Sequence, residues 1–348
     1  MADSLMEGSV PELVEGPLLA VQDLVVSARS RGKNIALVDG ISLAVNKGEI
    51  VGLVGESGCG KSTTSNAIMR LFPSQSVRQT SGELILDGTR YDTLKPKEMA
   101  TVRGARIAMI FQDPSTYLDP MMTVGKQVGE GLRVHRIPGN HQARVVELLG
   151  LMGLPDPEGM VHRYPHELSG GQRQRVLIAA ALAADPDLII ADEPSTALDV
   201  TVQAQILALL RELRDRLGVA ILFITHDLGV VAEMCDRVYV MYAGRIVESR
   251  EVHALYADPR HPYTAGLLGS TLSSSSDINE LFSIPGTVPD PRAMPKGCRF
   301  ASRCPLADDR CRTEQPPLVA VAGGESACWH HDHVAADMWR AGASGGAA

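Results

Sequence analysis

The chain has 348 residues and a net charge of −8, with 45% hydrophobic and 21% charged residues. This is the balance of an ordinary globular protein, with enough length for one large domain and a smaller one. The acidic charge argues against nucleic acid as the main partner, because nucleic-acid binders usually carry basic surfaces.

Membrane and export signals are missing from the sequence pattern. No apolar stretch approaches the roughly 20 residues that span a bilayer. The acidic start of the chain has no basic segment followed by an apolar one, as a signal peptide would. We therefore expect a cytoplasmic protein whose membrane role, if it has one, comes through its partners.

The first third of the chain predicts strands around one helix. Residues 1–16 are expected to be a flexible leader, and residues 17–255 to form the main domain. Apolar runs predict strands around the polar turn RSRGKN, a short buried strand, a helix and a further strand. These elements cover Leu18–Val26, Ile41–Val45, Glu49–Val54, Lys61–Leu71 and Arg106–Phe111.

The middle of the chain, about residues 113–187, is predicted to be a mainly helical subdomain. Its last helix, about Gln172–Ala184, ends before the stop signal Asp185-Pro186. Strands then return, and strands that alternate with helices predict an α/β core with a largely parallel sheet. These strands are expected at Leu188–Ala191, Val219–Ile224, Arg237–Met241 and Arg245–Glu248.

The character of the chain changes after about residue 255. Prolines and short polar segments dominate residues 256–334, and four of the six cysteines cluster there. In a cytoplasmic chain such a cluster more often binds a metal than forms disulfides. The last residues, 335–348, have a low-complexity composition and are predicted to be disordered.

A phosphate-binding loop follows the buried strand and precedes the first helix, which is the context that the P-loop pattern requires. Its glycines let backbone N–H groups turn toward phosphates, and the helix N-terminus favours the same charge. Lys61 would pair with β- and γ-phosphate oxygens, and Ser62 would bind Mg²⁺. The predicted nucleotide-binding residues are Gly55, Glu56, Ser57, Gly58, Cys59, Gly60, Lys61, Ser62 and Thr63.

Polar side chains follow three other predicted strands at their carboxyl ends. Asp192 suits the anchoring of Mg²⁺, and Glu193 would polarise the attacking water. His226 could reach the γ-phosphate, and Gln112 could contact Mg²⁺ or the water. Each residue alone would be weak evidence, since acids at strand ends and solvated histidines are common. Together with the P-loop they predict an ATPase site.

A second anion site is predicted at the run LSGGQ, just before a helix. Ser169, Gly170 and Gly171 would supply a hydroxyl and free backbone N–H groups. Two phosphate-binding elements are difficult to bring onto one nucleotide within one small domain. We therefore expect a dimer in which each chain closes over its partner's nucleotide.

This set of motifs, together with STALD at residues 195–199, resembles the ATP-binding subunit of ABC transporters over about residues 18–255. The resemblance implies an α/β P-loop NTPase core with a mainly helical subdomain, an antiparallel β portion and a small irregular C-terminal module. It adds Gln172 to the nucleotide-contacting residues and places Asp199 in a loop that links the two sites. It also implies that DPSTYLDPMMTVG, after Gln112, grips a membrane subunit.

The C-terminal part resembles the extension of dipeptide and oligopeptide importer ATPases, through RHPYT at residues 260–264, IPGTVPDP and the cysteines. In the dipeptide branch these cysteines are associated with a [4Fe-4S] cluster, whereas the chemistry of four thiolates suits Zn²⁺ equally. The spacing lacks the close cysteine pair of common zinc ribbons and favours iron–sulfur. Three histidines could compete as ligands. The cysteines are Cys298, Cys304, Cys311 and Cys328, and the histidines are His330, His331 and His333.

The resemblance implies an ATPase, with ATP and Mg²⁺ as cofactors, that energises the import of dipeptides or oligopeptides. Its partners would be an identical or paralogous ATPase subunit, two membrane permease subunits and, indirectly, an extracytoplasmic substrate-binding protein, at the cytoplasmic face of the membrane. A nickel or glutathione importer is an alternative. A soluble ATPase acting on nucleic acid or ribosomes fits less well, because the chain has one copy of each motif and no sustained heptads.

Two details of the nucleotide site depart from expectation. Residues 25–30 contain no aromatic side chain, although related ATPases often place one there to stack on adenine, so we expect loose base selectivity. Cys59 lies within the P-loop. It is either a small residue tolerated in a turn or a thiol whose pKa the helix dipole lowers, in which case alkylation would inhibit and nucleotide would protect.

Overall fold

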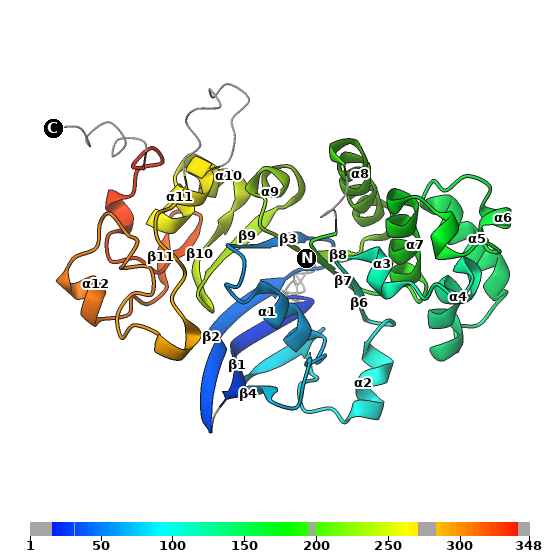
Figure 1. The fold of residues 1–348 in the computed structure, drawn as a ribbon, viewed down its shortest axis with the longest axis horizontal. Coiled ribbons are helices and arrows are strands. Elements are labelled where there is room, and N and C mark those ends of the chain that lie inside the picture. The colour runs from blue at the N-terminus through cyan, green and yellow to red at the C-terminus, as the bar shows by residue number, and fades with distance from the viewer. Residues whose placement is uncertain (1–15, 31, 195–198, 271–282, 340–348) are drawn as a thin grey trace, which may run out of the picture.

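The computed structural model describes residues 16–30, 32–194, 199–270 and 283–339. Most of the predicted leader, residues 1–16, and most of the predicted C-terminal tail, residues 335–348, lie outside these ranges. Within them the strands form two sheets, and helices pack mainly at the two ends of the molecule (Figure 1).

The larger sheet carries the nucleotide-binding strands. Its strand order is β11-β12-β10-β9-β3-β8-β7-β6. Neighbouring strands from β9 to β6 are parallel, whereas β10, β12 and β11 pair antiparallel. The bounds are β3 Ile50–Val54, β6 Ile107–Ile110, β7 Leu188–Asp192, β8 Ala220–Thr225, β9 Arg237–Tyr242, β10 Arg245–Glu251, β11 Val319–Val321 and β12 Gly324–Ser326.

The smaller sheet is antiparallel, with the order β2-β1-β4-β5. The sequence predicted two strands in the region of β1 and β2. In the structure both strands are longer and form a hairpin around the polar turn. The third strand, β4, was missed because residues 77–82 alternate irregularly between half-buried and exposed. The bounds are β1 Leu19–Ser30, β2 Lys33–Val45, β4 Val77–Leu86 and β5 Thr89–Arg90.

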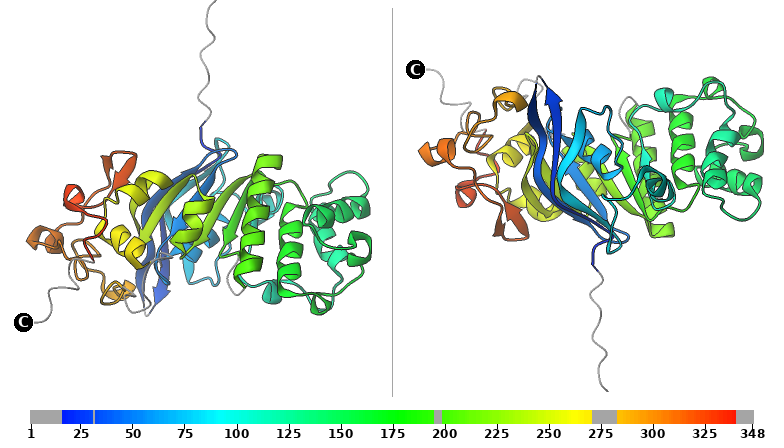
Figure 2. Two further views of the ribbon diagram at one scale, coloured as in Figure 1. Left: turned by 90° about the horizontal axis from the view of Figure 1, so that it is seen from above. Right: turned by 90° about the horizontal axis from the view of Figure 1, so that it is seen from below.

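Helices α3 to α7 gather at one end of the sheets, and α10 to α12 at the other, in all three views (Figures 1 and 2). The 113–187 limits of the helical subdomain remain a prediction. The bounds are α1 Lys61–Ile68, α2 Pro96–Val102, α3 Pro114–Tyr117, α4 Val124–Val134, α5 His141–Leu151, α6 Pro157–Met160, α7 Gly170–Leu182, α8 Val200–Leu217, α9 Leu228–Met234, α10 Val252–Ala257, α11 Pro262–Ser270 and α12 Asp309–Thr313, with short 3₁₀ turns η1 Pro165–Glu167, η3 Pro291–Ala293 and η4 His331–His333.

The two faces of the larger sheet bury two separate cores. In β8, Ile221 and Phe223 join the core on the helical side, while Leu222 and Ile224 join the core shared with the smaller sheet. Successive side chains of a strand point to opposite faces, so a strand covered on both faces is apolar throughout. This is why β3, β7 and β8 are continuous apolar runs. Because these three strands are parallel, their carboxyl ends lie at one edge of the sheet.

The C-terminal part is joined to the same sheet. Strand β12 pairs with β10 in the register Glu248↔Ser326, and β11 pairs with β12. The sequence predicted a small irregular module and gave no sign of this shared sheet. The backbone after α11 is therefore anchored to the core that carries the P-loop.

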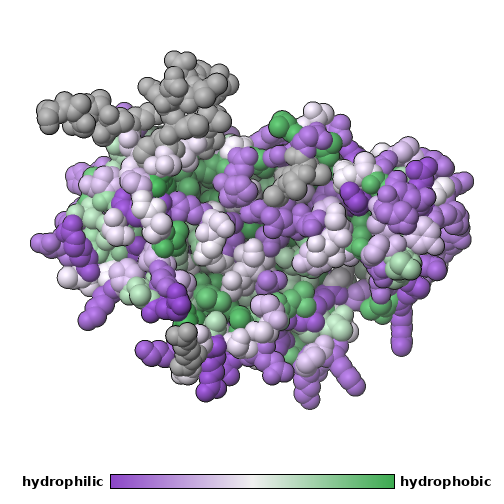
Figure 3. Space-filling model, in the orientation of Figure 1, coloured by the Kyte–Doolittle hydropathy of each residue, from purple (hydrophilic) through white to green (hydrophobic). Residues whose placement is uncertain are grey.

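In the view of Figure 3, the surface is hydrophilic over most of the end formed by α3 to α7. Hydrophobic residues show mainly as separate spots nearer the centre. None of the helices in the described ranges combines the length and apolar character that a membrane span requires.

Candidate functional site

The P-loop connects β3 to α1, as the sequence predicted. Gly60 lies at the N-cap of α1 with φ 115°, and Gly55 has φ 152°. A Cβ atom at Gly55 would collide with the carbonyl oxygen of Met241. Only glycine fits both positions without strain, because L side chains rarely adopt these φ values.

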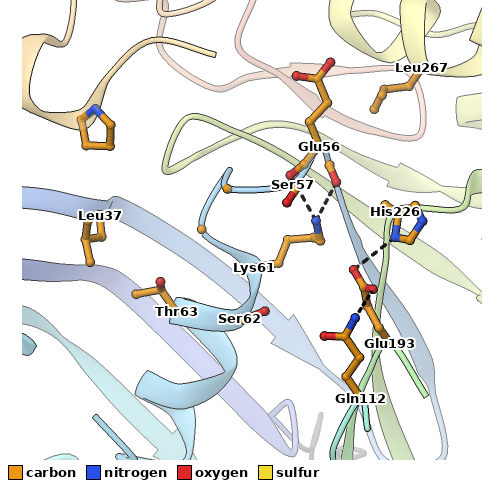
Figure 4. Close-up of a pocket in the computed structure, with 14 residues that line it drawn as sticks. Leu37, Glu56, Ser57, Lys61, Ser62, Thr63, Gln112, Glu193, His226 and Leu267 are labelled. Atoms are coloured by element: carbon orange, nitrogen blue, oxygen red, sulfur yellow. Dashed lines mark hydrogen bonds and ion pairs between the residues drawn. The ribbon is translucent and has the colours of Figure 1, made fainter. Parts of the chain in front are cut away.

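A cavity of about 700 Å³ lies over this loop. The volume falls in the range of sites for small molecules and cofactors. The cavity is surrounded by residues of the P-loop, by residues that follow the carboxyl ends of three strands, and by residues of the C-terminal part (Figure 4). The lining residues are Leu37, Gly55, Glu56, Ser57, Gly58, Gly60, Lys61, Ser62, Thr63, Gln112, Glu193, His226, Leu267 and Pro291.

Lys61 is buried and folded back onto its own loop. Its Nζ donates to the carbonyl oxygen of Gly55 at 2.7 Å and to that of Glu56 at 3.2 Å. These carbonyls hold the ammonium group inside the loop where phosphates would lie. The predicted pairing of Lys61 with phosphate oxygens stays a prediction, and the structure places its ammonium group within the loop.

Asp192 is the last residue of β7 and is buried beneath the loop. Its Oδ2 accepts a hydrogen bond from Ser65 Oγ at 3.3 Å. Burial raises the pKa of the Asp192 carboxyl, although hydrogen bonds from Ser65 and Ser62 lower it. Carboxylate, hydroxyl and amide oxygens are the ligands that Mg²⁺ prefers, so Asp192, Ser62 and Gln112 fit this ion.

Glu193 lies between two other predicted site residues. Its Oε2 accepts from Nε2 of Gln112 at 3.0 Å, and its Oε1 lies 3.1 Å from Nδ1 of His226. Gln112 follows β6 and His226 follows β8, so three strand ends bring these side chains together (Figure 4). The carboxylate is held at the cavity wall, where it could accept a proton from water.

The thiol of Cys59 is 1% exposed and is absent from the cavity lining. Burial raises the pKa of this thiol, although the charge of Lys61 lowers it. The hypothesis of a thiol activated by the helix dipole is therefore wrong, because loss of solvent outweighs the local positive charge. Cys59 is a small residue packed beneath the turn.

The LSGGQ residues do not line the cavity of their own chain. Ser169 is the N-cap of α7: its Oγ accepts from the N–H of Gln172 at 3.3 Å, and Gln172 Oε1 accepts from the N–H of Ser169 at 3.0 Å. This capping box fixes the helix start. Ser169 is exposed, and Gly170 and Gly171 follow it in the first turn.

Asp199 caps the next helix. Its Oδ1 accepts from the N–H of Val202 at 2.9 Å. The Val202 side chain lies beside Gly171, where a Cβ would come within 2.7 Å of it. Residues 195–198 of the predicted linking loop lie outside the described residues, so only its last residue is placed.

The comparisons with known proteins agree with the site. Residues 38–196 match the family model described as ABC transporter, and residues 247–311 match the one described as oligopeptide/dipeptide transporter, C-terminal region. The chain is 48% identical over 321 residues to a probable peptide ABC transporter ATP-binding protein, y4tR, of Sinorhizobium fredii, covering 91% of this chain and 96% of the relative. It is 51% identical over 309 residues to the oligopeptide transport ATP-binding protein OppD of Bacillus subtilis. That match covers 88% of this chain and 86% of the relative.

Solved structures give the same answer. The chain superposes on the dimeric ATP-binding cassette MJ0796 bound to ADP and Pi with a TM-score of 0.60 and 28% identity, covering 67% of this chain and 98% of the other. For cbiO1 of Clostridium perfringens the TM-score is 0.60 and the identity 28%, and the match covers 70% of this chain and 92% of cbiO1. Fold and site define a P-loop ATPase. The chain belongs to the ABC transporter family of ATP-binding proteins, in the branch that carries the oligopeptide/dipeptide transporter C-terminal region.

The four clustered cysteines line one small cavity beside His261 and Phe300. Its volume is about 10 Å³, which leaves room for about one water molecule. Within the described ranges, the side chains whose ligand atoms lie within 4.8 Å of one another are Asp308, Cys311 and His330. The cysteines are Cys298, Cys304, Cys311 and Cys328.

The predicted [4Fe-4S] cluster is therefore wrong. The grouped atoms include one thiol instead of four, and neither the matched families nor the named relatives are described as iron–sulfur proteins. The same group offers Zn²⁺ three ligand atoms, one fewer than a closed structural site uses. Asp308 already caps α12 by accepting from the N–H of Cys311 at 2.9 Å.

Sequence reasoning missed the C-terminal residues that reach the nucleotide site. Leu267 and Pro291 line the cavity. Tyr263 and Arg303 bind Glu56 within the P-loop. Tyr263 lies in the RHPYT motif that carried the family resemblance, but nothing in the spacing indicates a contact across more than 200 residues of chain.

Proposed function

We propose that this chain is the ATP-hydrolysing subunit of a peptide importer and that hydrolysis takes place over the P-loop. The observation that carries the proposal is the meeting of Lys61 and Glu193 at one cavity, with Asp192 buried beneath the P-loop, in a chain with the peptide-transporter C-terminal region. The peptide cargo is carried over from the named relatives, which are a probable peptide transporter subunit and an oligopeptide transport protein.

Each residue has a distinct part in this proposal. Lys61 leaves its loop carbonyls to bind phosphate oxygens, and the backbone N–H groups of Gly58 to Thr63 share the remaining charge. Asp192 and Ser62 would hold Mg²⁺, which would neutralise phosphate charge. Glu193 accepts a proton from the attacking water, while His226 and Gln112 orient the carboxylate.

The nucleobase rests on an apolar wall. Residues 25–30 offer no aromatic side chain, whereas Leu37 of β2 and Pro291 of η3 both line the cavity. An apolar wall holds any base by burial and reads few of its polar edges. In this proposal adenine binds without ring stacking and with weak selectivity for the base.

The working unit is a dimer with either a copy of this chain or a paralogue. Ser169, Gly170 and Gly171 are free of the cavity of their own chain, and Ser169 is exposed at the start of α7. A second subunit that faces this helix N-terminus would bring its own phosphates there. Closure of the two subunits would then complete both sites.

Two membrane permease subunits are the proposed anchor at the cytoplasmic face of the membrane. The segment after Gln112 exposes Tyr117 and Met121, which are 51% and 83% exposed. Large apolar side chains on a soluble surface suit a protein partner. An extracytoplasmic binding protein would act on this subunit only through those permeases, and we propose no contact with nucleic acid.

The test is reconstitution of the chain with its permeases and binding protein in vesicles. ATP turnover should rise when oligopeptides are supplied to the binding protein, and peptide should accumulate inside only with ATP. Stimulation by nickel or glutathione instead would assign one of the alternative cargoes. Stimulation by DNA or ribosomes, with no association with permeases, would overturn the importer proposal.

A further inference from the structure

The C-terminal part of the chain makes an ion pair with the P-loop. Nη1 of Arg303 donates to Oε2 of Glu56 at 2.7 Å, and Nη2 donates to Oε1 at 2.9 Å. The pair is bidentate, which is the geometry that makes guanidinium–carboxylate contacts strong and directional. The Arg303 side chain is 4% exposed, and that of Glu56 is 27% exposed.

The Arg303 side chain is also held by contacts other than the one with Glu56. Its Nε donates to the carbonyl oxygen of Pro285 at 2.9 Å, and Nη2 also donates to that of Ile284 at 3.1 Å. Nη1 reaches the hydroxyl of Tyr242 at 3.3 Å. The guanidinium group is thus part of the packed C-terminal region, and it presents a preorganised positive charge to the loop.

A second residue of the same region holds the backbone of Glu56. The N–H of Glu56 donates to the hydroxyl oxygen of Tyr263 at 2.8 Å, and Tyr263 is fully buried in α11. Residues that follow β10 therefore hold both the backbone N–H and the side chain of Glu56.

The charge of Glu56 is the reason why the contact matters. Glu56 lines the cavity in which we place ATP, and its carboxylate points away from Lys61 in Figure 4. An unpaired carboxylate there would repel the phosphates and would weaken the attraction that Lys61 exerts on them. Arg303 neutralises that carboxylate and holds it turned away from the loop.

We propose that Arg303 is a positioning residue of the nucleotide site: it cancels the charge of Glu56 and so links the C-terminal region to ATP affinity. The inference rests on the proposed ATP-binding function. Its consequence is that any partner or change that displaces Arg303 weakens ATP binding while the catalytic residues stay intact.

The experiment measures the dissociation constant of the full chain for Mg²⁺ and the non-hydrolysable analogue AMP-PNP by calorimetry. The variants are Arg303→Met, Arg303→Lys, Glu56→Gln and the double variant Arg303→Met with Glu56→Gln. Arg260→Met is the matched control, because Arg260 is a C-terminal arginine paired with Asp258 and Asp332 away from the cavity.

We expect Arg303→Met to weaken binding about tenfold, the scale of one unscreened charge near a polyphosphate. Arg303→Lys should lose less, because it keeps the charge. Glu56→Gln should bind AMP-PNP more tightly than the unmodified chain, because it removes a negative charge while Arg303 stays. The double variant, which removes both charges, should regain the affinity of the unmodified chain. The loss in Arg303→Met should shrink at high salt, since added ions screen charge repulsion.

A purely structural role for Arg303 predicts a different pattern. The double variant would then bind as weakly as Arg303→Met at every salt concentration, and that result overturns the proposal. Glu56→Gln keeps Arg303 packed, so a tenfold loss in this variant alone also overturns it, even if Arg303→Met fails to fold. Failure of the unmodified chain and of Arg260→Met to bind AMP-PNP would count against the ATP site itself.

Discussion

The backbone N–H of Glu193 donates to the carbonyl oxygen of Ile224 at 2.9 Å, which ties the residue after β7 to the neighbouring strand β8. Glu193 has φ 48°, a left-handed conformation that costs a non-glycine residue free energy. The hydrogen bond holds this conformation, and the turn directs the carboxylate toward Gln112 and His226. Backbone strain at this point serves the proposed water-activating position.

Replacement of Glu193 should stop turnover while leaving nucleotide affinity nearly unchanged. Glu193→Gln keeps the shape but cannot take a proton, so we expect kcat to fall by about 10²- to 10⁴-fold. Turnover of the reconstituted complex and AMP-PNP binding measure the two effects. Glu233→Gln is a matched control, because Glu233 is an exposed acid outside the cavity. Near-normal turnover of Glu193→Gln would transfer the role to another group.

His226→Ala should lower kcat with a small effect on ATP affinity, because His226 contacts the Glu193 carboxylate. A loss of about 10- to 100-fold is the scale expected for an orienting group in acid–base chemistry. His253→Ala, an exposed histidine in α10, serves as the control. If ATP affinity falls as much as kcat, His226 binds the ground state instead.

Complementation tests the shared site. A dimer of Lys61→Ala chains lacks the lysine in both sites, and a dimer of Ser169→Arg chains lacks the serine in both. A mixed dimer contains one site with an intact P-loop from one chain and an intact Ser169 from the other. Mixing the two inactive variants should restore ATP hydrolysis; a mixture that stays inactive while forming dimers contradicts the shared site. In an assembly with a paralogue, the second substitution goes into that subunit.

ATP and GTP should bind with similar affinity. The wall formed by Leu37 and Pro291 offers burial without polar groups aimed at the base. Leu37→Ala should weaken the binding of both nucleotides by about 3- to 10-fold, as the loss of a partly buried apolar side chain predicts. Calorimetry with each nucleotide measures this. A loss confined to ATP would show that Leu37 selects the base.

Stability should fall as pH rises through the range in which Glu248 titrates. Burial raises the pKa of the Glu248 carboxyl from 4.5 to about 7. Between these values the folded chain holds a proton that the unfolded chain has lost, so the free energy of unfolding decreases as pH rises. Glu248→Gln should flatten this dependence in urea unfolding from pH 5 to 8. The exposed neighbour substitution Glu251→Gln should leave the slope unchanged; an unchanged slope in Glu248→Gln would assign it to other groups.

Cys59 should resist alkylation in the folded chain. The thiol is 1% exposed, and burial raises its pKa. We expect N-ethylmaleimide to label Cys59 at the rate of unfolding, more slowly than the half-buried Cys298 and Cys304, as peptide mapping by mass spectrometry can measure. Fast labelling of Cys59 in the folded chain would show that its thiol is accessible to solvent and would contradict the prediction.

Most of the sheet and the nucleotide-binding loop follow from local patterns. Apolar runs such as the one before Glu193 predict strands, because a strand covered on both faces has no polar position. The structure confirms these strands within about one residue at most ends, with β10 running on to Glu251. The first helix was expected to reach Leu71 but ends at Ile68. The missed β4 carries no such pattern, since one of its faces is exposed over residues 77–82.

The cysteine cluster shows the limit of reasoning from resemblance. Spacing brings four thiols into one segment, and the structure does gather them around one cavity. The distances between ligand atoms and the space between them decide whether an inorganic cluster fits, and neither is encoded in spacing. The same limit applies to Cys59, because burial depends on the strands that pack above it.

The sequence by itself was enough to predict the proposed chemistry of this protein: a loop for phosphates, an acid for the metal, an acid for water and a separate serine–glycine turn. These depend on residues that lie close together along the chain, where backbone geometry and strand ends set their positions. Only the tertiary structure decided that Arg303 and Tyr263 bind Glu56 and that Pro291 helps to line the cavity. Those contacts join segments far apart in the chain, and they form only when the region after β10 folds back onto the P-loop, where β12 also pairs with β10.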